Sequence, residues 1–283
     1  MARIKPVPQA LDPLPPGTSC LLRQGDNAVA YHIPTTPSSD DASPLKTTIA
    51  LPRRSNWTSG LHFHAAHTEY LRLVKGAMFV ELHGQTKLIS AAKGGEIDRD
   101  TGDLMQEGLV IVVPRYARHN WGRLEHHIHT SNMSLGYDSN QQDLWPEDWT
   151  EDVVVEEWTD PSNIQKALFF WNLNRIITES SEATLKRRQQ VTKAILGRFW
   201  IDLQLFTVFW QLDNWPIFID LRLMPSVSSR EFFCRSTNAA EVVISFVLLF
   251  VARIAGLLLG LHAVEQRRTP DALWEAYSKP AHA

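Results

Sequence analysis

Short apolar runs separated by Gly, Pro and charged turns make up the chain from Thr47 to about Tyr137. Runs of this length that are continuously apolar, or that alternate with polar residues, predict β-strands, and their close spacing is typical of an antiparallel sandwich or barrel. The segments that we interpret as strands are TTIALP, EYLRLV, AMFVELHG, TKLISA, LVIVVP and HHIHTSNMSL. Because SCLLRQGDNAVAYHI has the same texture, we predict a β-domain over residues 20–145.

The pattern changes on both sides of this domain. The first 17 residues contain five prolines, which predicts an extended arm over residues 1–19. The segment PEDWTEDVVVEEWTD carries seven acidic side chains, so we interpret residues 146–162 as an exposed linker. Over residues 163–283 the apolar positions follow a helical period and predict a helical extension. It includes a nearly unbroken apolar helix over residues 242–263, interrupted only by Arg253.

The stretch GLHFHAAHTEYLRLVKG places three histidines and a glutamate in a strand-like context. Alternation would put His62 and His64 on one face of a strand, and a turn would return Glu69 to the same inner face. Buried imidazoles without partners are costly, whereas around a divalent metal each supplies a lone pair and the carboxylate offsets charge. A fourth ligand would come from VVPRYARHNWG, where His119 begins a strand that could lie opposite the first.

The spacing His62-x-His64-x4-Glu69-x6-Gly76, followed by Pro114-x4-His119, resembles the two motifs of the cupin superfamily. The resemblance implies a small β-barrel of the jelly-roll type over about residues 20–140. It also implies one divalent metal ion, Fe(II) foremost and otherwise Mn, Ni, Cu or Zn, held by His62, His64, Glu69 and His119. The second motif departs from the family at one place, since Tyr116 stands where the family usually has Gly.

Such a site leaves metal positions free for substrate and O2 or water, and two reaction classes stay open. A redox metal would permit an oxidoreductase or dioxygenase, which we expect first; a Lewis-acid metal would serve an isomerase, cyclase or lyase. A non-catalytic, membrane-associated ligand-binding protein is the third alternative. The residues that flank the ligands weakly indicate an apolar substrate, and they are Phe63, Leu71, Leu73, Phe79 and Trp121.

The helical extension is similar to the tails of stand-alone cupin-like proteins of filamentous fungi, several of which sit in natural-product gene clusters. That similarity implies a natural-product-type intermediate as the substrate, and a role in secondary metabolism and biosynthesis. Nothing in the sequence selects a catalytic acid or base, although Tyr70 and Glu81 are candidates for proton transfer.

Net charge and hydropathy bear on partners. A net charge of −3 gives no nucleic-acid footprint. No secretory signal is visible, so we expect an intracellular protein, either cytoplasmic or membrane-associated. Residues 242–263 are long enough to cross a bilayer, but the same helix could pack on the barrel or on a second copy in a homodimer. Both readings remain open.

The other histidines receive separate expectations. His67 lies in the turn between the ligands and should face solvent, or else donate a hydrogen bond that supports the ligands from outside. His83 should lie at the surface before a Gly turn. His126, His127 and His129 fall on a predicted strand, where one of them could line the cavity.

Overall fold

The computed structural model describes residues 5–38, 44–132, 146–178, 187–197, 199–221 and 230–279. Among them, no side chain is described at residues 131–132, 187–189, 191–192 and 230–238. Residues 1–4 of the predicted arm, 133–135 of the last predicted strand and several parts of the predicted helical extension lie outside the described residues.

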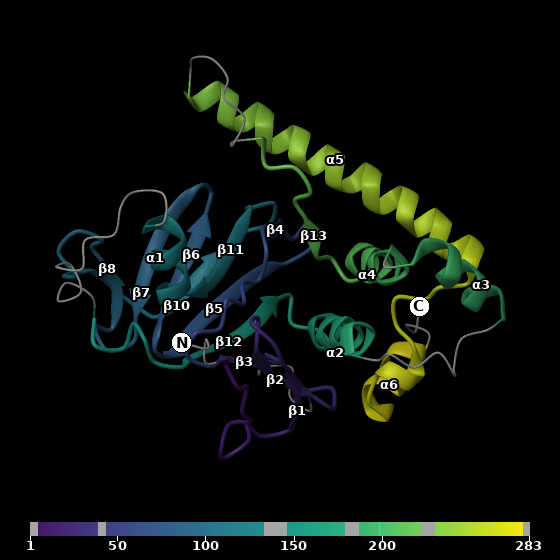
Figure 1. Ribbon diagram of the computed structural model, residues 1–283, viewed down its shortest axis with the longest axis horizontal. Helices are drawn as coiled ribbons and strands as arrows, with labels where there is room; N and C mark the ends of the chain where they lie inside the picture. The colour runs from purple at the N-terminus through teal and green to yellow at the C-terminus, as the bar shows by residue number, and fades with distance from the viewer. Residues whose placement is uncertain are drawn as a thin grey trace.

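Two antiparallel sheets face each other and form the β-domain at the left of Figure 1. One sheet has the order β1-β2-β3-β12-β5-β10, and the other has the order β13-β4-β11-β6-β7-β8-β9. The strands are β1 (Thr18–Arg23), β2 (Val29–Pro34), β3 (Thr47–Leu51), β4 (His62–Phe63), β5 (Thr68–Lys75), β6 (Ala77–Leu82), β7 (Gln85–Ser90), β8 (Gly95–Ile97), β9 (Leu104–Glu107), β10 (Val110–Val113), β11 (His119–Arg123), β12 (Val153–Asp160) and β13 (Trp215–Pro216).

Strand β5 shows why these residues form a two-layer structure. Glu69, Leu71 and Leu73 are buried on its inner face, while the residues between them are turned outward, as the period of two predicts. The turn into β6 requires a glycine at position 76, because φ is +77° there and a Cβ would lie 2.5 Å from the carbonyl oxygen of Asp152.

Two segments differ from the sequence expectations. Residues 153–160, which we interpreted as part of an acidic linker, form β12 between β3 and β5. Their inner positions alternate as Val153, Val155 and Glu157, so one acid is buried and the others lie toward the outside. The predicted strand HHIHTSNMSL begins instead as helix α1 (Leu124–Asn132), which packs on the outer side of β6.

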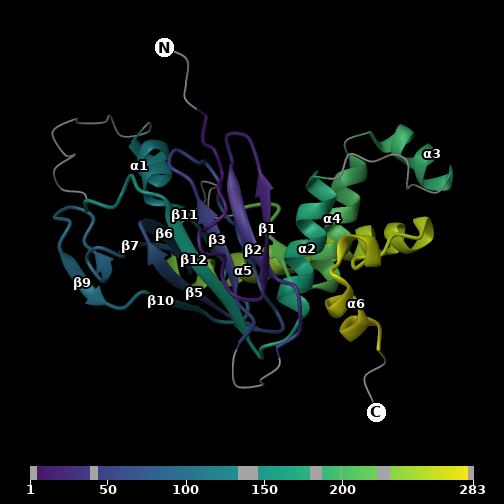
Figure 2. The ribbon, with the colours of Figure 1, turned by 90° about the horizontal axis from the view of Figure 1, so that it is seen from below.

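The helical region lies beside strands β1 and β2 of the β-domain, as Figure 2 shows from below. Helix α2 contacts β1 and β2, and its aromatic residues join the core of the barrel. The helices of this region are α2 (Gln165–Thr178), α3 (Arg187–Leu196), α4 (Phe199–Gln211), α5 (Arg230–Leu259), the short 3-10 helix η4 (Gln266–Arg268) and α6 (Asp271–Ser278). The predicted architecture, a two-sheet β-barrel followed by a helical region, is therefore confirmed.

Helix α5 crosses above α4 and β13 (Figure 1) and is tied to the barrel by a buried ion pair. Arg118, in the loop before β11, donates to both carboxylate oxygens of Glu241 at 2.9 Å and to Asp220 at 2.8 Å. Residues Ala239–Leu259 have the length and apolarity of a membrane span. Only 22% of the most apolar 18-residue window is buried inside the protein, so most of it is not covered by the described residues. The helix ends before residue 263, because Gly260 adopts φ +68° and Leu261 N–H caps the carbonyl of Gly256.

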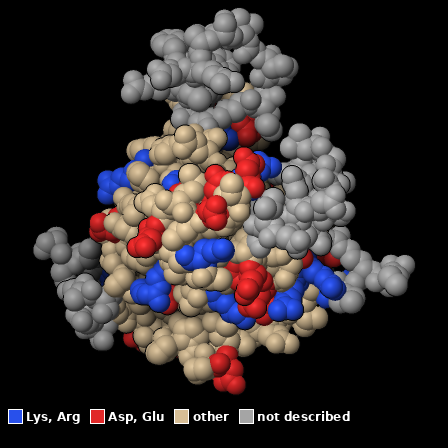
Figure 3. All heavy atoms as spheres, turned by 90° about the vertical axis from the view of Figure 1, so that its left-hand side faces the viewer, with Lys and Arg blue, Asp and Glu red and all other residues tan. Residues whose placement is uncertain are grey.

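The far end of the barrel carries both signs of charge. Figure 3 shows Lys and Arg interspersed with Asp and Glu on this face, rather than gathered by sign. Lys87, for example, pairs with Glu96 at 2.5 Å across β7 and β8. The described residues of this face therefore form no large patch of one charge.

Candidate metal centre

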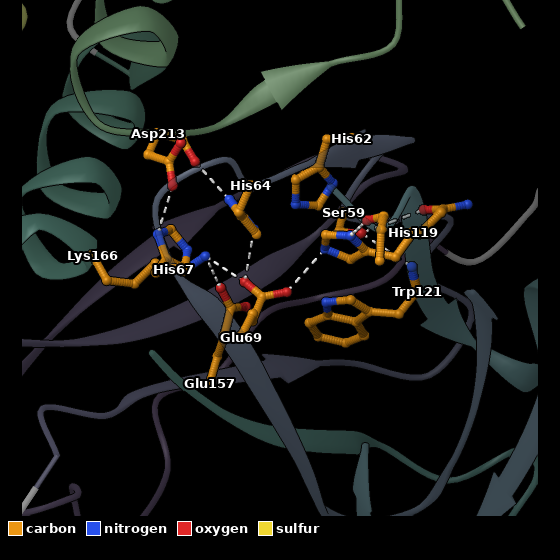
Figure 4. A network of polar contacts seen from close by, with 12 residues as sticks. Ser59, His62, His64, His67, Glu69, His119, Trp121, Glu157, Lys166 and Asp213 are labelled. Atoms are coloured by element: carbon orange, nitrogen blue, oxygen red, sulfur yellow. Dashed lines mark hydrogen bonds and ion pairs between the residues drawn. The ribbon is translucent and has the colours of Figure 1, made fainter. Parts of the chain in front are cut away.

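Four side chains from both sheets meet inside the barrel (Figure 4). His62 lies on β4, His64 directly after it, and His119 lies on β11, where it pairs in register with His62. Glu69 comes from β5 in the facing sheet. One ligand atom from each of the four lies within 4.8 Å of all the others, and all four residues are buried.

Backbone carbonyls set the orientation of all three imidazoles. The Nδ1 atoms of His62, His64 and His119 lie 2.7, 2.6 and 3.0 Å from the carbonyl oxygens of Gly60, Asp213 and Ala117 respectively. Because a carbonyl oxygen only accepts, Nδ1 must carry the ring proton. In a neutral ring, Nε2 is then left with a free lone pair, which is the state that a metal ligand requires.

Burial keeps two of the three rings, those of His62 and His64, neutral. It lowers the pKa of His62 well below the ordinary value, and the neighbouring imidazoles His119 and His64 act in the same direction. Burial likewise lowers the pKa of His64 to about 4, although the nearby Glu69 opposes that shift. These two rings are therefore unprotonated at neutral pH and can offer their Nε2 lone pairs.

The contacts of Glu69 indicate that a cation belongs at this point. His64 Nε2 lies 3.2 Å from Oε1 of Glu69, and His119 Nε2 lies 2.9 Å from Oε2. Since the ring protons are committed to carbonyls, lone pairs face lone pairs in both contacts. Accordingly, His119 Nε2 and Glu69 Oε2 are buried without a hydrogen bond. Three imidazoles with Nδ1 directed at carbonyl oxygens, together with one carboxylate, fit a divalent transition metal, and the cluster could bind one.

A buried lysine and a second buried glutamate adjoin the cluster, and the sequence analysis missed both. Lys166 of α2 lies 2.5 Å from Glu69 and 2.5 Å from Glu157 of β12. Burial would raise the pKa of Glu69, but the charge of Lys166 and contacts with the histidines hold it well below its ordinary range. Burial and the charge of Glu69 raise the pKa of Glu157 to about 8. Glu69 thus keeps the negative charge, and Glu157 is the carboxylate that takes up a proton more readily.

The strand pattern of β12 contains the one signal that could have found Glu157. Residue 157 follows Val153 and Val155 at a spacing of two, so it shares their buried face. No local pattern singles out Lys166, since a lysine in the first turn of a helix is ordinarily solvated.

His67 lies elsewhere than expected. It is 8% exposed, stacks on His64 with 4.2 Å between ring centroids, and donates from Nδ1 to Asp213 at 2.8 Å. Asp213 follows α4 in the helical region, so the turn between the ligands is covered by a segment almost 150 residues away. The expectation that His67 faces solvent was therefore wrong; His83 is exposed, as expected.

A cavity of about 290 Å³ adjoins the cluster between the barrel and the helices α2 and α4. His62, Glu157 and Lys166 stand at its polar side. Its apolar wall comes largely from the two helices, with Tyr31, Ile49 and Trp57 added by the barrel. The helical residues are Phe169, Phe170, Leu173, Ile177, Leu205 and Phe209.

The five residues that we expected around the substrate lie outside this cavity. Leu71, Leu73 and Trp121 belong to the main core, and Phe63 packs against Trp215 and Leu249 on the outer side of β4. Phe79 lies in a separate cluster under α1, with its ring 4.8 Å from that of His127. None of the five lines the cavity, whose apolar wall comes mostly from the helical region.

The remaining candidates have structural environments. Tyr70 lies on the outer face of β5 and stacks on Trp158 at 5.4 Å, which turns it away from the cluster. Glu81 accepts a hydrogen bond from Asn120 at 3.1 Å. His126, His127 and His129 lie on α1, outside the barrel.

No family model matches the chain, and no curated protein sequence matches it. Solved structures do resemble its β-domain. A cupin-2 domain from Rhodospirillum rubrum is 13% identical, with a TM-score of 0.30, over 54% of this chain and 75% of that chain. An RmlC-like cupin from Shewanella frigidimarina is 11% identical, with a TM-score of 0.27, over 50% of this chain and 83% of that chain.

A third solved structure, described as a predicted oxalate decarboxylase from Thermotoga maritima, is 14% identical, with a TM-score of 0.29. The match covers 50% of this chain and 91% of that chain. The first two of these neighbours are described as cupins. At such identities and TM-scores, they say nothing about what this chain binds or converts.

Proposed function

We propose that this protein is a metal-dependent enzyme that acts on a small apolar molecule. As the reaction class we propose an oxidation of the dioxygenase type on a natural-product-type intermediate. The observation that carries the proposal is the buried set of ligand atoms from His62, His64, Glu69 and His119, in which each ring directs Nε2 away from the carbonyl that holds Nδ1. Without a cation, His119 Nε2 and Glu69 Oε2 are buried without a hydrogen bond, which costs free energy of folding.

These four residues would hold one divalent ion, Fe(II) foremost. Fe(II) supplies one-electron chemistry with O2 when bound, whereas Mn, Ni, Cu or Zn at the same ligands can supply other redox or Lewis-acid chemistry. His62 is the ligand that also lines the cavity, so a bound molecule would reach the centre along the side of His62.

The cavity supports an apolar substrate. The rings of Phe169 and Phe170 lie 5.3 Å apart, and Phe209 lies 6.1 Å from Phe169. Aromatic walls of this kind bury an apolar body and exclude water from the reacting end. A cavity of about 290 Å³ accommodates a small molecule rather than a polymer segment.

One observation favours a second candidate, an isomerase or cyclase. Lys166 is 6% exposed and presents a buried positive charge to the cavity beside the metal ligands. A fixed cation in a site that excludes water stabilises negative charge that develops on a substrate oxygen, which is the requirement of a non-redox rearrangement. Its partners Glu69 and Glu157 hold the ammonium in place.

The first test is the metal content of the full-length protein purified without oxygen. We expect about one metal ion per chain, because the four ligand atoms converge on one point. The variants His62→Ala and His119→Ala should each weaken metal affinity by more than about 100-fold, since loss of an outer-shell partner alone costs 10–100-fold. Elemental analysis and competition with a chelator measure both quantities.

His127→Ala is the matched control, because this histidine is also partly buried but lies on α1 outside the barrel. It should keep the metal content of the wild type. Wild-type protein that takes up none of Fe(II), Mn(II), Ni(II), Cu(II) or Zn(II) would falsify the proposed function.

The two reaction classes are separated by oxygen dependence. A panel of small apolar phenols and ketones can be screened with the metal-loaded protein in aerated and in oxygen-free buffer. Turnover coupled to O2 uptake supports the oxidoreductase. Turnover that persists without oxygen, and that falls in Lys166→Met, supports the isomerase or cyclase.

A further inference from the structure

Asp213 accepts several hydrogen bonds from the turn that joins the ligands His64 and Glu69 (Figure 4). It lies in the turn between α4 and β13, with φ at +53°, and is 7% exposed. Its carboxylate accepts the backbone N–H of Ala65 at 2.9 Å and that of Ala66 at 2.8 Å. It also accepts from His67 at 2.8 Å and from Trp215 at 2.7 Å.

Three of these four donors belong to the turn between the ligands His64 and Glu69. The backbone carbonyl of Asp213 accepts in addition from Nδ1 of His64, at 2.6 Å. One residue of the helical region therefore directs the ring of His64 and holds the path of the chain to Glu69. The adjacent β13 pairs with β4, so the segment that carries Asp213 is itself fastened to the strand of His62.

His64, His67 and Asp213 also lie within 4.8 Å of one another, which raises the alternative of a second metal site. The hydrogen bonds decide against it. Nδ1 of His64 is committed to the Asp213 carbonyl and Nε2 faces Glu69, so His64 has no atom left for a second ion. Each carboxylate oxygen of Asp213 already accepts two N–H groups.

We propose that Asp213 is a positioning residue for the metal centre, through which the helical region completes a site whose ligands all lie in the barrel. The proposal rests on the proposed function, in that it requires a metal at His62, His64, Glu69 and His119. Outer-shell partners of a ligating histidine typically change metal affinity by 10–100-fold, and Asp213 is such a partner by its carbonyl and by the turn that it holds.

The test compares Asp213→Asn with Asp148→Asn in the full-length protein, with Co(II) as the probe. Asp148 is also 7% exposed and also holds a turn, by accepting from Ser90 at 2.8 Å and from Ala92 at 2.9 Å. We expect Asp213→Asn to weaken Co(II) binding by about 10–100-fold and to change the visible spectrum of bound Co(II). Asp148→Asn should lower stability toward urea but leave the affinity and the spectrum as in the wild type.

A second variant keeps the test decisive if Asp213→Asn does not fold. His67→Phe retains a ring stacked on His64 but removes the N–H that Asp213 accepts. It should weaken Co(II) binding several-fold. Wild-type affinity and spectrum in Asp213→Asn, or in His67→Phe when it alone folds, overturn the proposal. Failure of the wild type to bind Co(II) and the five metals of the first test overturns the proposed function instead.

Discussion

Lys166 places a positive charge in the interior, where lysine is rarely found unless it is paired. Its ammonium lies between Glu69 and Glu157, so three ionisable groups share one buried volume. Because the carboxylates offset the cost of burying the ammonium, its pKa is raised above the ordinary value despite burial, which by itself would lower that pKa. In the metal-free protein, Lys166 is therefore the counter-charge that keeps Glu69 ionised.

Replacing Lys166 should therefore destabilise the metal-free protein. Lys166→Met leaves two buried carboxylates without a cation, and breaking a buried pair in this way typically costs about 3–5 kcal/mol. The free energy of unfolding in urea, with a chelator present, measures this loss. Saturation with metal should restore part of it, because an ion that binds only the folded state stabilises that state.

Two comparisons check the reason for this loss. Lys166→Met/Glu69→Gln should recover stability, since Glu69, the carboxylate that keeps its negative charge, is then replaced by a neutral amide. Lys46→Met breaks a pair with Glu156, 3.0 Å long, whose side chains are 36% and 22% exposed. It should cost no more than about 1 kcal/mol, as exposed pairs do. Equal losses in Lys46→Met and Lys166→Met would contradict the assignment of Lys166 as a buried counter-charge.

At the scale of elements, α5 packs on α4 at a point where no side chain fits between them. A Cβ on Gly256 would lie 2.9 Å from Oγ1 of Thr207, and that hydroxyl is held by the carbonyl of Leu203 at 2.9 Å. Gly256 and Gly260, which lie four residues apart near the end of α5, therefore have different roles. The first allows close helix packing, and the second ends the helix with a positive φ.

Gly256→Ala should push α5 away from α4 and cost about 1–3 kcal/mol, as overpacking does. The measurement is the free energy of unfolding in urea. Thr207→Ala should have a smaller effect, because it removes the hydroxyl and one methyl group and opens space beside Gly256. The double variant should recover most of the loss. A double variant as unstable as Gly256→Ala would show that the contact with Thr207 is not the cause.

At the scale of the whole molecule, α5 leaves an apolar stripe uncovered. The exposed residues recur at helical spacing on one side of the helix and include Val243, Val247, Phe250, Val251, Ile254 and Leu258. Arg253, which the sequence places in the middle of the apolar run, donates instead to Gln211 of α4 at 3.0 Å. The stripe is therefore uncharged. It lies within the apolar segment Ala239–Leu259, whose 21 residues extend over about 30 Å, the thickness of the apolar part of a bilayer.

The sequence leaves two possibilities open for residues 242–263, packing on protein or association with a membrane, and we propose the second. The full-length chain should float with phosphatidylcholine vesicles in a density gradient, and Val247→Glu/Val251→Glu should abolish flotation. The matched control is Val110→Glu/Val112→Glu, which charges two valines of β10 that are 45% and 47% exposed, on the other sheet of the barrel. Wild-type protein that stays with the soluble fraction would count against the membrane.

Local spacing was enough to predict the barrel strands and to single out the four side chains that meet inside it. Parity along a strand is a property of neighbouring residues, so His62, His64 and Glu69 could be placed on inner faces without the fold, and Gly76 could be placed at a turn. His119 could be added because its motif has its own spacing. The helical period likewise indicated the apolar helix.

Only the tertiary structure brought Lys166, Glu157 and Asp213 to the centre. Lys166 and Glu69 are separated by 97 residues, and Asp213 and Ala65 by 148, so no local pattern relates them. Charged residues are ordinarily solvated. For this reason we interpreted the acid-rich strand β12 as part of a linker, and no pattern in the sequence singled out Lys166. Their burial depends on partners that arrive with the helical region, and so does the wall of the cavity.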